Sequence, residues 1–212
     1  MTNPVILLGA GGHGGVVLDA LLLCGANVVG VCDPALDAGA TTPGGLAVLD
    51  SGRLAETHPP AKFIIANGIG FMPGQTARRS LFENMRDQGY SFADVRHPSA
   101  VIAGSVTFGD GVQVMAGTVI QNACDIGTNT IINTGAQLDH GCAVGALCHI
   151  CPGAILSGDV VIGEGAFVGA GAVVVNGLRI GRGAVIGAGS VVTRDVVDEG
   201  RVVTPLTRDL AT

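Results

Sequence analysis

The chain has 212 residues, of which 35 are glycine, while charged and aromatic residues supply only 13% and 3%. An apolar content of 48% at so low a charge excludes intrinsic disorder, and a net charge of −6 without a basic run argues against nucleic acid or an acidic membrane surface as partner. The early apolar stretch 16–32 is interrupted by polar residues and glycine, and the six cysteines lack the spacing of a secreted disulfide scaffold, so we expect a cytoplasmic protein without membrane insertion.

The first half of the chain is typical of a small α/β domain. The apolar run 5–9 predicts a strand, residues 16–24 predict a helix, and residues 28–32 predict a second strand. Further along, residues 61–66 predict another buried strand and residues 76–88 a helix with one apolar face.

A glycine-rich segment joins the first strand to the first helix. It has the pattern G-x-G-x-x-G at Gly9, Gly11 and Gly14, and an acid follows nineteen residues later at Asp33. Such glycines allow backbone N–H groups and a helix N-terminus to approach a diphosphate closely. Residues 1–98 are too few for a complete dinucleotide-binding fold, and a nucleotide diphosphate carrying a sugar needs the same cradle. The segment therefore favours a nucleotide sugar over NAD.

The second half of the chain is a repeat with a period of six. Neither a helical period of 3.6 nor a strand period of 2 generates it. Glycine, asparagine and aspartate between the apolar positions predict short strands joined by tight corners, and three such strands close one triangular coil. We therefore expect a parallel β-helix of about five coils, in which residue i stacks on residue i+18. The apolar residues, expected inside, are Ile102, Phe108, Val114, Ile120, Ile126, Ile132, Leu138, Val144, Ile150, Leu156, Ile162, Val168, Val174, Ile180, Ile186 and Val192.

Two histidines, His140 and His149, lie within the repeats, where the repeat itself does not call for histidine. A neutral imidazole accepts a proton near neutral pH, which is what a general base requires. The alternative for His140 is a surface histidine without a catalytic role.

A metal or redox site is the less favoured interpretation of the same region. Cys148 and Cys151 match C-x-x-C, but the period of six places Cys148 inside the β-helix and Cys151 outside, so packing is favoured. A zinc site shared between subunits would need three converging imidazoles, for which two histidines are weak support. We therefore expect no metal.

In this order, the two halves resemble the hexapeptide-repeat acetyltransferases of the family of sialic acid O-acetyltransferases and bacillosamine or perosamine N-acetyltransferases. The likeness spans residues 4–205 and rests on the hexads, on the G-x-[SG]-G-H motif at 9–13 and on the segment 133–142, which is similar to the family's N-T-x-x-x-x-E-H-D/E-C. It implies an α/β half-Rossmann-like domain, residues 1–98, followed by a left-handed parallel β-helix with a C-terminal tail, residues 99–212. It also implies a homotrimer that binds acyl-CoA between neighbouring prisms.

The resemblance implies roles for individual residues. His140 would be the general base, and His149 and Gly158 would contact acetyl-CoA. The residues expected to hold the nucleotide sugar are Gly11, Gly12, His13, Asp33 and Asn133.

The expected reaction is acetyl-CoA-dependent N-acetylation of a nucleotide-linked amino sugar, a 4-amino-4,6-dideoxy sugar, by direct attack on the thioester. O-acetylation of a sialic acid and a non-catalytic trimeric nucleotide-sugar-binding protein are the alternatives.

Two departures from the family pattern bear on this expectation. Many relatives follow the catalytic histidine with an acid, whereas Gly141 follows His140 here, which leaves open whether Asp139, Asn133 or a neighbouring subunit orients the imidazole. The segment 203–206 also differs from the G-x-P-A of relatives, so the resemblance assigns it no contacts with CoA.

Overall fold

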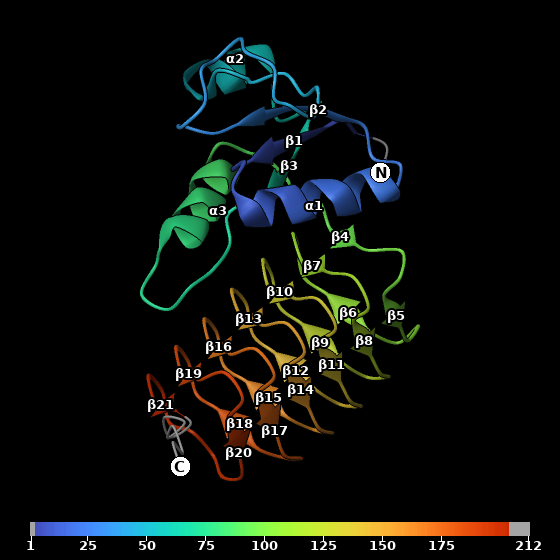
Figure 1. Cartoon of the computed structure of the whole chain (residues 1–212), viewed down its shortest axis with the longest axis vertical. Coiled ribbons are helices and arrows are strands. Elements are labelled where there is room, and N and C mark those ends of the chain that lie inside the picture. Colours follow the sequence, from blue (N-terminus) through green and yellow to red (C-terminus); the bar gives the residue numbers. More distant parts are fainter. Residues whose placement is uncertain (1–2, 204–212) are drawn as a thin grey trace, which may run out of the picture.

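The computed structural model describes residues 3–203, so the tail segment 204–212 lies outside the described residues. An α/β domain lies at one end of a long three-sided solenoid (Figure 1). In the α/β domain, strand β1 (Val5–Leu8) lies between β2 (Val28–Cys32) and β3 (Ile64–Asn67), and both pairings are parallel. The predicted strands are confirmed, although the third begins three residues later than expected.

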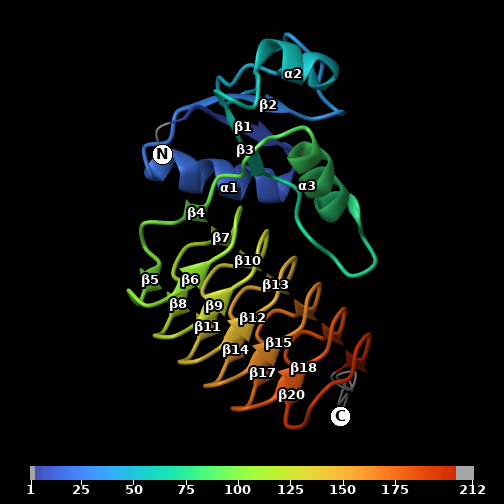
Figure 2. The same cartoon turned by 180° about the vertical axis from the view of Figure 1, so that it is seen from behind.

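The helices of this domain lie on both sides of the small sheet, as the two opposite views show (Figures 1 and 2). They are α1 (Gly12–Leu23), α2 (Leu54–Thr57), which follows a 3-10 turn at Ser51–Arg53, and α3 (Ala77–Asp87). Helix α1 begins four residues before the predicted start at residue 16. Glycine is a poor helix former, yet the N–H of Gly15 donates to the carbonyl of Gly11 at 3.0 Å, so the glycine run forms the first turn.

The central strand β1 is buried on both faces. Val5 and Leu7 belong to the apolar cluster that includes residues of α1, and Ile6 and Leu8 belong to the cluster that includes Phe82 of α3. Each fully buried aliphatic side chain contributes about 1.5–3 kcal/mol to stability, which explains why this short parallel strand is apolar at every position.

The solenoid consists of eighteen two-residue strands in three parallel sheets of seven, six and five strands. The seven-stranded sheet contains β4 (Val95–Arg96), β7 (Gln113–Val114), β10 (Ile131–Ile132), β13 (His149–Ile150), β16 (Phe167–Val168), β19 (Val185–Ile186) and β21 (Arg201–Val202). The six-stranded sheet contains β5 (Val101–Ile102), β8 (Val119–Ile120), β11 (Gln137–Leu138), β14 (Ile155–Leu156), β17 (Val173–Val174) and β20 (Val191–Val192). The five-stranded sheet contains β6 (Thr107–Phe108), β9 (Asp125–Ile126), β12 (Ala143–Val144), β15 (Val161–Ile162) and β18 (Arg179–Ile180).

The predicted spacing of eighteen residues between stacked positions is confirmed. Ile131 pairs with His149, for example, and His149 with Phe167. The last coil differs, because Ile180 pairs with Val196 and Val185 pairs with Arg201 after sixteen residues. The solenoid has about six coils rather than five, since β4 and β21 extend it beyond both ends of the hexad run.

The apolar series fills the interior of the solenoid as expected. All of its members are buried except Ile102 and Phe108, which lie at the start and are half-buried. Polar groups among the smaller inward side chains bond to carbonyls fifteen residues on: the Thr130 hydroxyl donates to the Gly145 carbonyl at 2.8 Å and the Cys148 thiol to the Gly163 carbonyl at 3.1 Å. All six cysteines are free thiols, so the C-x-x-C pair is unbridged.

The α/β domain covers the outward face of the seven-stranded sheet near its first strands (Figure 1). Gln113 and Ile131 point away from the solenoid interior, yet both are fully buried. The two parts therefore share a packed junction, in which polar side chains are enclosed. Within residues 3–203, none of the helices is both long and apolar enough to cross a bilayer.

Candidate active site

The glycine-rich segment after β1 is closely packed against its neighbours. Gly9 has a φ of +99°, in the region that favours glycine. A Cβ on Gly14 or on Gly68 would overlap the carbonyl oxygen of Gly9. These glycines therefore allow the loop after β1, the first turn of α1 and the loop after β3 to meet backbone to backbone.

Two other glycines border open space at the start of α1, where the diphosphate-binding cradle was predicted. A Cβ on Gly11 or Gly12 would meet no heavy atom within 4 Å, and no side chain caps the start of α1. The carboxylate of Asp33, at the end of β2, accepts from the N–H of Ala10 at 2.6 Å and from that of Ala35 at 2.8 Å. The structure thus brings Gly11, Gly12 and Asp33 together at the carboxyl ends of parallel strands, beside a helix N-terminus that favours anions.

His13 lies in the first turn of α1 but bonds to the solenoid. Its Nε2 lies 2.9 Å from Oε1 of Gln113, whose Nε2 donates to the carbonyl of Asn67 at 2.7 Å. The Gln113 oxygen can only accept, so Nε2 of His13 carries the proton. Burial lowers the pKa of His13 from 6.5 to about 4, so the ring is neutral near pH 7. Its expected contact with the nucleotide sugar stays a prediction.

Arg78 of α3 is a buried cation at the junction, which the sequence analysis did not single out. The guanidinium donates to three backbone carbonyls, those of Asn67 (3.3 Å), Ile69 (2.6 Å) and Asn129 (3.2 and 3.3 Å). Burial lowers the pKa of Arg78 to about 9, so it remains charged at neutral pH. The signal in the sequence is its position on the same face of the helix as Phe82 and Met85, where an arginine must find buried partners.

His149 also lies at this junction, on the outward face of the seven-stranded sheet. Its Nδ1 lies 2.9 Å from the carbonyl oxygen of Phe71, and its Nε2 lies 3.0 Å from Nδ2 of Asn133. The Phe71 oxygen can only accept and the Asn133 amide donates, so Nδ1 carries the proton and Nε2 accepts. The imidazole is only 8% exposed, and burial lowers its pKa. Both nitrogens are therefore engaged, and the expected contact with acyl-CoA stays a prediction.

His140 occupies a different place, the corner between the six-stranded and five-stranded sheets. Its side chain is 56% exposed, and its backbone N–H donates to Oδ1 of Asp139 at 2.8 Å. The imidazole lies against Gly158 of the next coil, where a Cβ would be only 2.6 Å from Cε1. His140 and Gly158 are therefore in contact on an exposed corner, and their roles in catalysis and in binding acetyl-CoA stay predictions.

One chain does not gather all the predicted residues. Gly11, Gly12 and Asp33 form the cradle, His13, Asn133 and His149 lie in the buried junction, and His140 and Gly158 lie on the exposed corner. His140 and His149, nine residues apart, are on different sides of the solenoid because one coil turns through three sheets.

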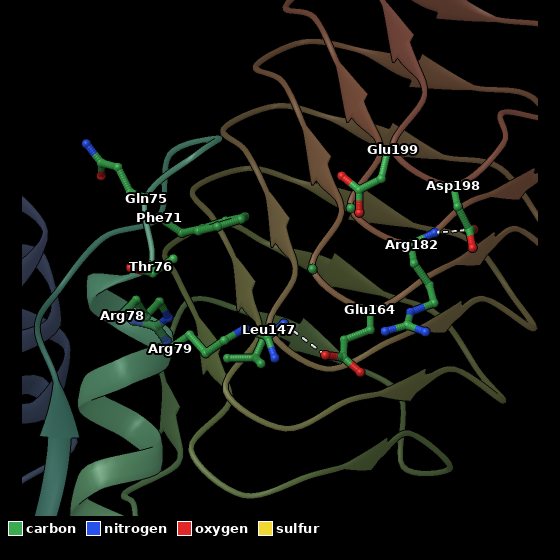
Figure 3. A pocket seen from close by; sticks show the side chains of 12 residues that line it. Phe71, Gln75, Thr76, Arg78, Arg79, Leu147, Glu164, Arg182, Asp198 and Glu199 are labelled. Atoms are coloured by element: carbon green, nitrogen blue, oxygen red, sulfur yellow. Dashed lines mark hydrogen bonds and ion pairs between the residues drawn. The ribbon is translucent and has the colours of Figure 1, made fainter.

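A cavity of about 410 Å³ lies between the segment before α3 and the solenoid (Figure 3). Side chains of both charges line it, and Arg79 donates to Glu164 at 2.8 Å across it, while Phe71 reaches over the coils from the domain. Neither His140 nor the glycine cradle belongs to its lining. Among residues 3–203, no group of three or more histidine, cysteine or carboxylate side chains is arranged to hold a metal ion.

Each half of the chain contains a segment that matches the model of a known protein family. Residues 4–85 match the family model of the PglD N-terminal domain, and residues 159–194 match that of the bacterial transferase hexapeptide (six repeats). Curated protein sequences give no significant match.

Three solved structures are similar over nearly the whole chain. Perosamine N-acetyltransferase from Caulobacter crescentus, a variant with one histidine replaced by asparagine in complex with CoA and GDP-perosamine, is 38% identical, with 95% of this chain and 93% of that chain covered and a TM-score of 0.85. The acetyltransferase domain of PglB from Neisseria gonorrhoeae in complex with acetyl coenzyme A is 30% identical, with 95% and 96% covered and a TM-score of 0.85. WeeI from Acinetobacter baumannii is 25% identical, with 96% and 98% covered and a TM-score of 0.83.

These matches fix the fold and the class of protein. The solenoid is a left-handed parallel β-helix, as the resemblance implied. The extent of the matches, the glycine cradle and the exposed histidine of the hexads are all consistent with one family. The chain belongs to the hexapeptide-repeat acetyltransferases with a PglD-type N-terminal domain, the family of nucleotide-amino-sugar N-acetyltransferases.

Proposed function

We propose that the protein transfers the acetyl group of acetyl-CoA to the amino group of a nucleotide-linked 4-amino-4,6-dideoxy sugar. The observation that carries the proposal is the exposed imidazole of His140 on Gly158, within a chain similar over 95% of its length to an enzyme crystallised with CoA and GDP-perosamine. The glycine cradle supports the nucleotide-linked form of the acceptor, because it offers backbone N–H groups to a diphosphate.

The acceptor is held by the α/β domain. The N–H groups at Gly11 and Gly12 bind the diphosphate at the start of α1, and the Asp33 carboxylate fixes the loop and accepts from a sugar hydroxyl. His13 and Asn133 hold the sugar from the junction side. Because both side chains already bond to the protein, they contribute a rigid wall rather than free groups.

The donor lies along the solenoid beside His140. A groove of about 240 Å³ runs over the outward face of the six-stranded sheet, and Asp139 and Ser157, which precede His140 and Gly158, line it. Acetyl-CoA in this groove would bring its thioester to the corner, with Gly158 in contact. His149 contacts acetyl-CoA only if its nitrogens leave Phe71 or Asn133.

The reaction is a direct displacement. The lone pair of the sugar amine attacks the thioester carbonyl carbon, and His140 accepts the proton that the amine loses as the C–N bond forms. The resulting tetrahedral intermediate collapses by breaking the C–S bond, and CoA leaves as the thiolate, which takes up a proton. No covalent enzyme intermediate is needed, because the thiolate is a good leaving group.

A homotrimer would complete the site. On the outward face of the six-stranded sheet, the exposed apolar residues Val101, Ile155 and Val191 lie in one column, with Gln137 between the first two, and His140 lies at the edge of this face. Exposed apolar side chains on one flat face are typical of subunit interfaces. A neighbouring prism on this face would bring a second chain close to the His140 corner.

The six unpaired cysteines fit a reducing compartment, so we propose a cytoplasmic location.

The test is an acetyl-transfer assay with GDP- and UDP-linked amino sugars, in which release of the CoA thiol is measured and the product is analysed for an amide or an ester. We expect an amide, and we expect the His140→Ala variant to lose about 10²–10⁴-fold in kcat, the usual contribution of a general base. An ester product would indicate O-acetylation, thiol release at the wild-type rate in His140→Ala would remove His140 from the mechanism, and absence of release with any acceptor would contradict the activity.

A further inference from the structure

The corner that carries His140 is built from two dipeptides on successive coils, His140–Gly141 and Gly158–Asp159. The N–H of Asp159 donates to the carbonyl of His140 at 2.9 Å, so the two dipeptides stack directly. Each side chain lies over the glycine of the other coil: a Cβ on Gly158 would collide with the imidazole, and a Cβ on Gly141 would overlap the Asp159 carboxylate. The corner is therefore shaped to hold an imidazole and a carboxylate side by side.

The carboxylate faces one nitrogen of the imidazole. Oδ1 of Asp159 lies 3.8 Å from Nδ1 of His140, within ion-pair distance and longer than a hydrogen bond. Hydrogen bonds of catalytic groups are often long before substrate binds, and a small rotation of either exposed side chain closes this gap. A proton on Nδ1, directed at the carboxylate, leaves the lone pair on Nε2, which is the atom that a general base needs.

Stability does not account for this arrangement. The side chains of His140 and Asp159 are 56% and 71% exposed, and exposed ion pairs contribute only about 0–1 kcal/mol. Asp159 also has a φ of +60°, in the left-handed region, whereas the stacked positions one coil away on either side are glycines, Gly141 and Gly177. Ala123, in the same column, has a φ of +58°, and aspartate tolerates this region, so the backbone permits a carboxylate at residue 159 but does not account for its place beside the imidazole.

We propose that Asp159 is the positioning residue of His140 in acetyl transfer, an inference that rests on the proposed role of His140 as general base. It replaces the acid that many relatives carry directly after the catalytic histidine. Here that position is Gly141, and the carboxylate comes from the next coil, nineteen residues after His140. Gly141 is then required for a specific reason, because any side chain there would occupy the space of the carboxylate.

During the reaction Asp159 remains ionised. The proton released by the amine moves to Nε2 of His140, and the imidazolium that forms donates through Nδ1–H to Asp159. The carboxylate fixes the tautomer and stabilises the positive charge without accepting a proton itself, which is the role of the aspartate in a Ser-His-Asp triad.

The first test is Asp159→Asn in the full-length protein. We expect kcat to fall about 10- to 100-fold, less than in His140→Ala, with KM for both substrates and the melting temperature unchanged, because the carboxylate acts on the base rather than on binding. Asp125→Asn is the matched control: it removes the same charge from the five-stranded sheet, where Asp125 accepts from the hydroxyl of Thr107, and should leave kcat at the wild-type value.

The second test moves the carboxylate to the position that relatives use. Asp159→Gly should lower kcat like Asp159→Asn, and adding Gly141→Asp to it should restore most of kcat, since aspartate already tolerates the same left-handed backbone at residue 159. A folded double variant that is no more active than Asp159→Gly overturns the inference. Wild-type kcat in Asp159→Asn, while His140→Ala is inactive, refutes the positioning role and leaves the proposed function standing. Wild-type kcat in His140→Ala refutes both.

Discussion

The two histidines of the β-helix, nine residues apart, occupy opposite kinds of surroundings. His140 lies on an exposed corner, over a glycine and beside a carboxylate at 3.8 Å. His149 lies in the junction between the domains, with Nδ1 on the Phe71 carbonyl and Nε2 on the Asn133 amide. The first has an imidazole that reactants can reach, and the second has one whose nitrogens are already used.

The position of a histidine within the repeat decides whether its side chain is exposed or buried. Successive coils place residues eighteen apart in one column, so residues nine apart fall on different sides of the solenoid. A histidine on the corner remains exposed, whereas a histidine on the sheet covered by the α/β domain is buried near the Arg78 cation. We therefore expect substitutions at the corner to change activity and substitutions at the junction to change stability.

The largest effect should follow from Gly158→Ala. The added Cβ would lie 2.6 Å from Cε1 of His140 and displace the imidazole, so kcat should fall by about 100-fold or more, within the range of a lost general base. The free energy of unfolding should change little, because the imidazole is exposed. Gly104→Ala is the matched control, since a Cβ there meets no heavy atom within 4 Å. Steady-state kinetics at saturating acetyl-CoA measures the effect, and an unchanged kcat would show that the position of His140 does not matter.

His149→Ala should lower the stability of the protein rather than its activity. It removes the partners of the Phe71 carbonyl and the Asn133 amide in the junction, and because both groups are part-buried, we expect the loss in the free energy of unfolding to total about 1–3 kcal/mol. Urea unfolding at fixed protein concentration measures the loss, and the exposed-corner variant His140→Ala should stay within about 0.5 kcal/mol of wild type. Wild-type stability together with lost acetyl transfer would instead place His149 in the chemistry and end the contrast between the two histidines.

The sequence predicted the regular part of the molecule better than the irregular part. The hexads determine the strands, the corners and the register, because the side chains of each coil pack in the same way as those of the coil before it. The start of α1 was missed by four residues, since glycine propensity is overridden by the packing of Gly14 against Gly9.

For the candidate site, the sequence predicted His140, Gly158 and the glycine cradle, whose roles stay predictions, and it singled out neither Arg78 nor Asp159, the proposed positioning residue. Arg78 could have been found as a charge on an apolar helix face. Asp159 could have been found by applying the spacing of eighteen to Gly141, which the family pattern had already marked as unusual. The partners of His149 depend on how the α/β domain packs on the solenoid, and no periodicity contains that information.

The smallest expected effect is a pH dependence confined to the junction. The pKa of His13 is lowered from 6.5 to about 4, chiefly by burial, so the unfolded chain binds a proton that the folded chain does not. Above pH 6.5 this difference in proton binding does not affect the free energy of unfolding, which then decreases as the pH falls toward 4. The expected decrease is about 1 kcal/mol between pH 7 and pH 5.5. Urea midpoints at these two pH values should therefore differ less in His13→Gln than in wild type, whereas Gly104→Ala, which changes no titratable group, should keep the wild-type difference. Equal differences in all three proteins would mean that protonation of His13 does not oppose folding.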